Sequence, residues 1–382
     1  MAFSGVAIYD IYTNEVGEDV SDLVSNISPN KTRFLDDIGD SDTNITSKMY
    51  SWEEGALLPD TYSNSSAIAS NAGGAIGIEV GANAGYLRVD DILRSQAAGN
   101  EMMRVVSIGT SAATIFVERA YAGTTANSAA AGITVDFLGS AVTEGSGARN
   151  QRRVGKVLKN NFVQLFREDI NLSTLTTNTR FKSAGQPDPM EEEKADKTTE
   201  VLKQLEKNVL MGRTNGNTIG ADNEETTMAG IYNSIATNIV SHATFSNSIL
   251  NNMLASIDGY TDLAGEVDSY ALYCGQTAFR KASNNRSGRI EEDVEDTVGG
   301  VKKITKYHTD FGPMPISYIR WLPAGSVLAI RKDFVKVRPF AGNSFQFKEY
   351  DNGNLARQGY IAGTYGLEFH QEQAHGRLDG LA

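Results

Sequence analysis

Residues 189–211 carry the signals of one long helix, and this helix constrains the fold more than any other feature of the chain. Asp188 stands in the N-cap position, and Pro189 follows in the first helical position, where its missing amide hydrogen costs nothing. Gly212 comes after the last helical residue, where we expect a left-handed C-cap. About 23 residues at a rise of 1.5 Å give roughly 35 Å, so this helix can span a whole domain.

One face of the predicted helix is apolar and the other is charged. Apolar and small side chains recur at alternating steps of three and four residues, and of these we expect the core-facing set to be Ala195, Leu202, Leu205 and Val209. The opposite, solvent-facing side carries Lys194, Lys197, Lys203 and Lys207. A helix of this kind also fits any other α+β protein.

The segment before the helix, residues 149–180, has the composition of a long extended β segment and begins with a cluster of positive charge. Its five cations are Arg149, Arg152, Arg153, Lys156 and Lys159. The whole chain has a formal net charge of −12, which argues against a protein that binds nucleic acid through a broadly basic face. We predict that the cluster contacts an acidic surface on another copy of the same protein. A solvated strand face is the alternative.

Length and composition predict a soluble globular protein. At 382 residues we expect two or three domains, and hydrophobic and charged contents of 40% and 21% are ordinary for this class. The single cysteine, Cys274, excludes an internal disulfide and is expected in a core. No signal-peptide pattern and no apolar run of about 18 residues is present, which favours a cytoplasm-like compartment without a membrane partner.

Residues 60–148 have the pattern of a separate β module. Short β-prone runs separated by turn residues occur at 86–89, 92–94, 102–108, 114–119 and 133–138. Strands at this spacing with glycine-containing turns predict a small antiparallel barrel or sandwich. Because the module lies between extended limbs, residues 43–59 and 149–182, we expect a hairpin with a barrel inserted near its tip.

The remaining segments complete an α+β chain. We expect an extended arm over residues 1–26 and a short helical turn at 30–39, stopped by Gly39. An α/β pattern follows the long helix, with helices at 247–257 and 276–284 and strands at 269–274, 304–309, 316–321 and 327–330. The C-terminal part is again rich in β-prone runs, at 334–340, 345–350 and 359–371.

The spacing of the candidate residues matches none of the metal-binding or phosphate-binding motifs of enzymes that we considered. His370 and His375 are five residues apart, which does not match the i, i+4 spacing of a zinc helix. The glycines at 73–77 precede no Lys-Ser/Thr pair, and the aspartates at 36–42 lack the spacing of a calcium loop. We therefore assign no catalytic, cofactor-binding or metal-binding residue and predict that the chain is not an enzyme.

Local motifs carry a resemblance to a known family. They are YSWEEGAL at residues 50–57, the run from 103 to 125 that ends in VERAYAGTT, AVTEG at 141–145, and YGLEF at 365–369 with AHG at 374–376. With the order of arm, hairpin, long helix, α/β domain and closing β segment, the chain resembles the major capsid (major head) protein of tailed bacteriophages. The resemblance is to the Hong Kong 97-type fold, in a branch with a β-barrel inserted into its extended loop, the E-loop.

This resemblance implies a division of the chain. Residues 1–42 would be the N-terminal arm, residues 43–59 and 149–182 the limbs of the E-loop, and residues 60–148 the inserted β-barrel domain. The peripheral domain with its spine helix would comprise residues 189–225 and 334–382, and the axial domain residues 226–333. Some capsids of this fold form a Lys–Asn isopeptide crosslink, for which Lys156 or Lys159 lies on the correct limb, without an identified asparagine.

The resemblance also implies a function. The protein would assemble with itself into pentamers and hexamers that form the icosahedral head around the double-stranded DNA of a tailed phage. Scaffolding, portal and decoration proteins would be further partners, the scaffold being a separate protein, and the acidic shell would hold DNA only by confinement. The expected location is the virion capsid, after assembly in the host cytoplasm. No cofactor is implied.

A β-rich carbohydrate-binding or adhesin-like protein is the alternative from another class. In that case the module at residues 60–148 would present an exposed platform of aromatic side chains. Its aromatic residues are few, with Tyr86, Phe116, Tyr121 and Phe137 the main ones. The sequence therefore favours a shell protein.

Overall fold

The computed structural model describes residues 32–39, 41, 43–69, 75–97, 99–109, 114–149, 151–175, 189–215, 225–285, 290–292, 304–351, 353 and 355–382. Contacts divide the chain into two compact units. The main unit comprises Met1–Trp52 and Lys159–Ala382, and the inserted unit comprises Glu53–Leu158. The arm expected at residues 1–26, the N-cap Asp188 and the limb beyond residue 175 lie outside the described residues.

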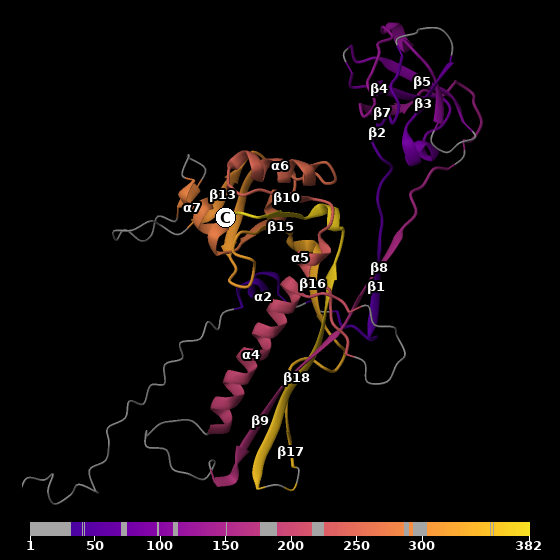
Figure 1. Ribbon diagram of the computed structural model, residues 1–382. Coiled ribbons are helices and arrows are strands. Elements are labelled where there is room, and N and C mark those ends of the chain that lie inside the picture. Colours follow the sequence, from indigo (N-terminus) through magenta and orange to yellow (C-terminus); the bar gives the residue numbers. More distant parts are fainter. Residues whose placement is uncertain are drawn as a thin grey trace, which may run out of the picture. The chain divides into compact units, whose positions relative to one another are not determined.

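A seven-stranded mixed sheet forms one part of the main unit (Figure 1). Its strand order is β10 (Ile239–Ser241), β19 (Gly376–Asp379), β15 (Val327–Arg331), β11 (Tyr270–Cys274), β14 (Gly312–Tyr318), β13 (Ile304–Thr309) and β12 (Ile290–Glu292). β11 is buried along its whole length, as an uninterrupted apolar run predicts for a central strand. Helices α6 (Asn247–Asp258) and α7 (Gln276–Asn284) share a core with these strands.

A second sheet is built around one long strand. β18 (Ala356–Phe369) pairs with β16 (Val335–Pro339), β17 (Gln346–Tyr350) and β9 (Gln164–Ser173), each time antiparallel. The long helix α4 (Pro189–Met211) lies alongside β9 and β18 (Figure 1). Alternate residues of β9, among them Phe166 and Ile170, are buried in the core shared with α4, whereas Leu165 is exposed.

Short helices complete the two units. They are α2 (Arg33–Ile38), α5 (Ile231–Ser234) and the 3₁₀ turns η1 (Gly81–Tyr86), η2 (Tyr121–Gly123), η3 (Val267–Ser269), η4 (Lys332–Phe334) and η5 (Glu372–Ala374). The helical turn predicted at residues 30–39 is confirmed as α2, and Gly39 ends it with a φ of 72°. That backbone conformation favours glycine over residues with a Cβ atom.

The predicted bounds of the long helix are confirmed, but its core-facing residues are only partly correct. Leu205 and Val209 are buried as expected, whereas Ala195 is exposed and Leu202 is only partly buried. The buried positions of the helix are Met190, Val201, Leu205, Glu206, Val209 and Leu210. Because a helix has 3.6 residues per turn, the face of Val201 and Leu205 continues back through residues 197 and 194 to Met190, and not through Ala195.

Two lysines assigned to the solvent side therefore lie toward the sheet. The Lys194 Nζ atom is 4.3 Å from the centroid of the Phe347 ring, and the Lys197 Nζ atom is 3.9 Å from a carboxylate oxygen of Glu168 on β9. Long lysine stems can cover apolar surface while the ammonium group remains hydrated. The N-terminal half of α4 thus packs through lysine side chains where the sequence pattern suggested Ala195.

Gly212 is required for packing and not for a left-handed C-cap, which corrects the sequence interpretation. The φ angle of Gly212 is not positive, so its backbone is not left-handed. A Cβ atom built on Gly212 would lie 2.5 Å from the carbonyl oxygen of Asn208 and 2.6 Å from that of Met228. The amide of Gly230 donates to the Gly212 carbonyl at 3.0 Å. The chain returning after α4 passes so close to the helix end that only glycine fits there.

The inserted unit is a six-stranded antiparallel sheet with its own core. Its strand order is β2 (Thr61–Ser63), β7 (Thr134–Ser140), β4 (Asp91–Ser95), β5 (Met102–Ile108), β6 (Thr114–Glu118) and β3 (Ala75–Glu79). Leu93, Met103, Val105 and Ile115 are fully buried in this core. The predicted runs at 92–94, 102–108, 114–119 and 133–138 are confirmed as β4, β5, β6 and β7. The strand predicted at 86–89 is wrong, because this stretch ends η1, where the Leu87 amide donates to the Ala84 carbonyl, and then turns without strand pairing. Among the described residues no strand pairing joins β2 to β3, so closure into a barrel stays a prediction.

A buried ion pair fixes the loops at one end of this sheet. Arg119 and Glu101 lie 2.5 Å apart (Nη2 to Oε2) with both side chains almost fully buried. Arg119 also donates to the carbonyls of Ala69 and Asn127, and Glu101 accepts from the amides of Ala120 and Asn127. Burial alone would raise the pKa of Glu101, but the hydrogen bonds from Arg119 and the two amides outweigh burial and lower it.

Replacing Arg119 by methionine should destabilise the inserted unit by about 3–5 kcal/mol, because it leaves the Glu101 carboxylate buried without its partner. The free energy of opening is measured from amide hydrogen exchange of peptides within residues 53–158 under increasing urea. Arg104→Met is the matched control, since Arg104 forms a solvent-exposed pair with Glu118 at 2.8 Å and should cost at most about 1 kcal/mol. Equal losses in the two variants would contradict the structural role of the buried pair.

Candidate subunit interface

A two-stranded ribbon joins the two units in sequence. It consists of β1 (Met49–Glu54) and β8 (Val157–Phe162). The extended strand expected from residue 149 is wrong for its first part, because residues 149–156 take part in no strand pairing where the structure describes them. β8 begins only at Val157. The side chains of Arg149 and Arg152, which precede β8, are bound by residues of the inserted unit.

Asn161 and Tyr50 anchor the base of the ribbon to β18. The buried Asn161 side chain donates to the carbonyls of Leu367, at 2.8 Å, and Ala229, and accepts from the Ala229 amide at 2.9 Å. The Tyr50 hydroxyl donates to the same Leu367 carbonyl at 2.5 Å. Burial, with Glu368 nearby, raises the pKa of Tyr50, so its hydroxyl stays a donor.

Gly366 allows this close approach. A Cβ atom there would lie 2.7 Å from both Ile45 Cδ1 and Tyr50 Cε1. Gly366 belongs to the YGLEF motif and Tyr50 to the YSWEEGAL motif, so two of the quoted motifs meet at the base of the ribbon. The sequence pattern gave no sign of this contact, because the two residues are separated by most of the chain.

Beyond its base the ribbon exposes large apolar side chains. Leu57, which follows β1, is 93% exposed, and Val157 and Leu158 at the start of β8 are 56% and 67% exposed. Successive residues of a strand point to opposite faces, so Val157 and Leu158 leave apolar surface on both faces of the ribbon. A two-stranded ribbon is marginally stable alone, and exposed apolar surface of this kind is typical of an interaction site.

Two cations of the predicted cluster are bound inside the inserted unit. The Arg152 guanidinium lies 2.8 Å from the fully buried Asp91 carboxylate and 4.6 Å from the centroid of the Phe137 ring. Arg149 lies 3.9 Å from Asp91 and donates to the carbonyl of Val89. Their primary partner is therefore Asp91 of the same chain and not the acidic surface of another copy. The sequence could not identify Asp91, because it precedes Arg152 by 61 residues.

The other three cations are exposed on or beside the ribbon. Lys156 pairs with Glu53 across the ribbon at 2.7 Å, and the hydrogen bond from Lys156 lowers the pKa of Glu53. Arg153 and Lys159 are exposed, and Arg153 contributes to the lowered pKa of Glu53 without forming a close ion pair with it. Three of the five cations thus lie at the surface of the chain.

The aromatic side chains of the inserted unit do not form a platform in the described residues. The Phe137 ring is covered by Arg152, and the Arg104 guanidinium lies 5.5 Å from the centroid of the Tyr121 ring. The Phe116 ring lies over Gly77: a Cβ atom on Gly77 would be 3.4 Å from this ring. This arrangement gives no support to a carbohydrate-binding surface.

The histidines considered for a metal have other roles. His375 is fully buried, its Nδ1 atom accepts from the Arg331 amide at 3.2 Å, and its Nε2 atom lies 3.1 Å from the His370 carbonyl. Burial lowers the pKa of His375 to about 3, so the ring is neutral. Cys274 is a buried core residue, as predicted. Within the described residues no group of three His, Cys, Asp or Glu could hold a metal ion.

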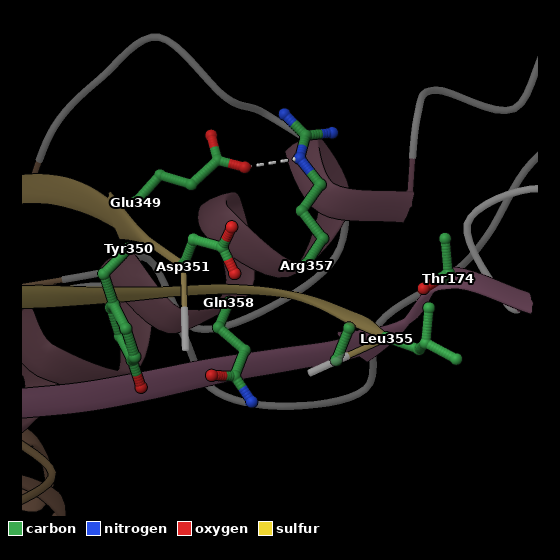
Figure 2. Close-up of a pocket in the computed structure, with 8 residues that line it drawn as sticks. Thr174, Glu349, Tyr350, Asp351, Leu355, Arg357 and Gln358 are labelled. Atoms are coloured by element: carbon green, nitrogen blue, oxygen red, sulfur yellow. Dashed lines mark hydrogen bonds and ion pairs between the residues drawn. The ribbon is translucent and has the colours of Figure 1, made fainter. Parts of the chain in front are cut away.

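A shallow hollow lies at the end of the second sheet where β17 and β18 meet. Figure 2 shows its lining residues, Thr174, Glu349, Tyr350, Asp351, Leu355, Ala356, Arg357 and Gln358. Arg357 donates to Glu349 at 2.8 Å. The lining is of mixed charge and holds neither a histidine nor a cysteine, so it suits a surface contact better than catalysis.

No helix of the described residues is long and apolar enough to cross a membrane.

Comparison with protein families identifies the chain. A model of the SU10 major capsid protein family matches residues 6–382. The chain belongs to the SU10 major capsid protein family. It is thus a structural protein that forms a viral capsid, and not an enzyme. The resemblance to the major capsid proteins of tailed phages is confirmed, and the virion capsid is where the protein resides.

Solved structures show the same fold at low sequence identity. A chain from the capsid of a native GTA particle has a TM-score of 0.53 and 9% identity, over 99% of this chain and 100% of that chain. A chain of Mycobacterium phage Cain has a TM-score of 0.51 and 12% identity, over 99% of each chain. At these identities the similarity establishes a capsid-like mixed α and β fold. Comparison with curated protein sequences gives no match.

Replacing Asn161 by alanine should loosen the base of the ribbon by about 1–3 kcal/mol, because the half-buried amide and carbonyl of Ala229 lose this side-chain partner and the Leu367 carbonyl loses one of its two side-chain donors. Amide hydrogen exchange of β1 and β8 measures the effect. Asn160→Ala is the matched control, since the neighbouring Asn160 is exposed and its recorded side-chain contact is a weak one to the Met49 sulfur at 3.5 Å. Unchanged exchange in Asn161→Ala would rule out the anchoring role.

Proposed function

We propose that copies of this capsid protein assemble as pentamers and hexamers into the icosahedral head that encloses the double-stranded DNA of a tailed phage. The observation that carries the proposal is the β1–β8 ribbon, which is anchored at its base and exposes Leu57, Val157 and Leu158 beyond it. A ribbon that is held at its base by its own subunit, with apolar side chains that no described residue covers, is suited to reach a neighbouring subunit.

The proposed architecture is the Hong Kong 97-type fold. Residues 1–42 would act as the N-terminal arm, the limbs at 43–59 and 149–182 as the E-loop, and residues 60–148 as a barrel-like insertion. Residues 189–225 and 334–382 would form the peripheral domain around α4, and residues 226–333 the axial domain. One adjustment follows from the strand pairing: β19 pairs with β10 and β15, so residues 376–379 belong with the axial sheet.

Assembly would depend on many weak contacts. Burying one exposed leucine in a neighbour contributes about 1.5–3 kcal/mol, which alone cannot hold two subunits together. In a closed symmetric shell each subunit makes such contacts with several neighbours at once, and the contacts then reinforce each other. Arg153 and Lys159 would add charge complementarity with an acidic neighbour, since each copy carries a net charge of −12.

The same net charge bears on the contents and partners of the shell. An acidic lining repels DNA, so the genome would be held by confinement. Scaffolding, portal and decoration proteins are further proposed partners, and assembly is proposed to occur in the host cytoplasm. The inserted unit is an independent folded body to which such a partner could bind without disturbing the main unit.

Leu158→Asp is expected to abolish particles while the subunit stays folded, because a charge replaces an apolar side chain that neighbours would bury. Size-exclusion chromatography and negative-stain microscopy of the expressed protein measure assembly, and circular dichroism measures folding. Val142→Asp is the matched control, since Val142 of the inserted unit is 48% exposed but lies outside the ribbon. Normal particles from Leu158→Asp would refute the proposed ribbon contact.

Charge-reversal variants distinguish the exposed cations Arg153 and Lys159 from Arg152, which is bound by Asp91. The double variant Arg153→Glu, Lys159→Glu should reduce particle yield with little effect on the thermal unfolding of the subunit. Arg152→Glu should instead lower the unfolding temperature of the inserted unit, because the buried Asp91 then faces a like charge. Full particle yield from the double variant would show that the exposed cations are merely solvated.

A further inference from the structure

The short helix α2 is docked on the main unit by two side chains. Phe34 is fully buried and meets the Tyr273 ring edge-on, with 4.9 Å between ring centroids. Asp37 accepts from the Tyr273 hydroxyl and forms an ion pair with Lys332 at 2.8 Å. These contacts hold α2 against β11 and η4 of the main unit.

Glu206 of the long helix α4 lies against the beginning of α2. Its side chain is 1% exposed, and the backbone amides of Phe34 and Leu35 donate hydrogen bonds to it. The first amides of a helix have no partner within the helix, and the N-cap residue Thr32 offers none from its side chain. A carboxylate from α4 thus does the work of a capping residue for α2.

Among the residues that the structure describes, no cation forms an ion pair with this buried carboxylate. Its Oε2 atom has no hydrogen-bond partner, and neither Lys203 nor Lys207 of α4 forms an ion pair with it in the described part of the chain. Lys207 lies over the Trp321 ring at 4.4 Å.

The charged groups of the elements packed around Glu206 do not favour its ionised form. On α2, Asp36 repels the ionised carboxylate, and Asp37 is already engaged by Tyr273 of β11 and Lys332 of η4. Burial, with a smaller contribution from Asp36, raises the pKa of Glu206 to about 7. The amides of Leu35 and Phe34 oppose this shift without cancelling it.

We propose that Glu206 makes α2 a proton-controlled clasp, which is held firmly on the rest of the main unit when the carboxyl group is neutral and loosens when it is ionised. The geometry that supports this is a fully buried acid at the meeting point of two elements far apart in the sequence, with one orphaned oxygen and no paired cation in the described part of the chain. Opening α2 would hydrate Glu206 and remove the cost of burying its charge. The inference concerns a contact within the subunit and does not depend on the proposed architecture of the shell.

The direction of the effect follows from the protonation states. Docked Glu206 has a pKa of about 7, whereas a solvated glutamate has a pKa near 4.5. The docked state therefore binds more protons between these two values, its stability is fully present below pH 4.5, and it is lost as pH rises through 7. From pH 6 to pH 8 the equilibrium constant for opening α2 should rise roughly tenfold.

Hydrogen exchange of the full chain tests the clasp. Exchange of a peptide covering α2 is followed by mass spectrometry from pH 5.5 to pH 8.5 and corrected for intrinsic exchange rates, with the buried strand β11 as an internal reference. We expect α2 to open progressively with a midpoint near pH 7 while β11 stays protected. In Glu206→Gln, which keeps the shape but cannot ionise, this pH dependence should disappear.

Glu200→Gln is the matched control. Glu200 lies on the same helix with a side chain 47% exposed and paired with Lys197, so this variant should keep the wild-type titration. The proposal is overturned if wild-type α2 shows no pH dependence, if Glu206→Gln titrates like the wild type, or if β11 opens in parallel with α2. The wild-type titration and its β11 reference decide the matter even if Glu206→Gln does not fold.

Discussion

Strand β18 is the element on which the rest of the main unit depends. Over residues 356–365 it pairs with β9, and on its other edge it pairs first with β17 and then with β16. Its Leu367 carbonyl also receives the two side chains that anchor the ribbon, Asn161 and Tyr50. A single strand thus connects the sheet beneath α4 to the part of the molecule that is suited to reach a neighbour. A capsid protein needs this rigidity, because a contact on a flexible base would cost ordering entropy at every copy of the interface.

Charge serves two different purposes in the subunit. The pairs Arg119–Glu101 and Arg152–Asp91 are buried or partly buried and fix loops of the inserted unit. Arg153 and Lys159 stay at the surface, where an interaction with another acidic copy would be long in range and sensitive to salt. Glu206 differs from both groups, because it is buried without a paired cation among the described residues, and in our proposal it responds to pH instead of providing constant stability.

The sequence predicted elements better than it predicted contacts. The bounds of α4, the short helix stopped by Gly39 and the strands β4 to β7 of the inserted unit follow from caps, turns and periodicity, which act over a few residues, whereas β2 and β3 were not predicted. The core face of α4 was only half correct, because Lys194 and Lys197 pack through their stems and hide the true stripe from a pattern of apolar residues. Gly212 was identified as important but for the wrong reason, since its constraint comes from Met228 and Asn208.

By itself, the sequence determined the order of helices and strands, the acidic character of the chain and, through a few local motifs, its membership of a capsid family. The tertiary structure alone decided which of five neighbouring cations are exposed and which are bound by Asp91. It also decided that Gly366 and Tyr50 meet, and that Glu206 caps α2. The physical reason is the same in each case: local signals depend on residues within a turn or two, whereas burial and pairing of a side chain depend on partners that folding brings from far along the chain.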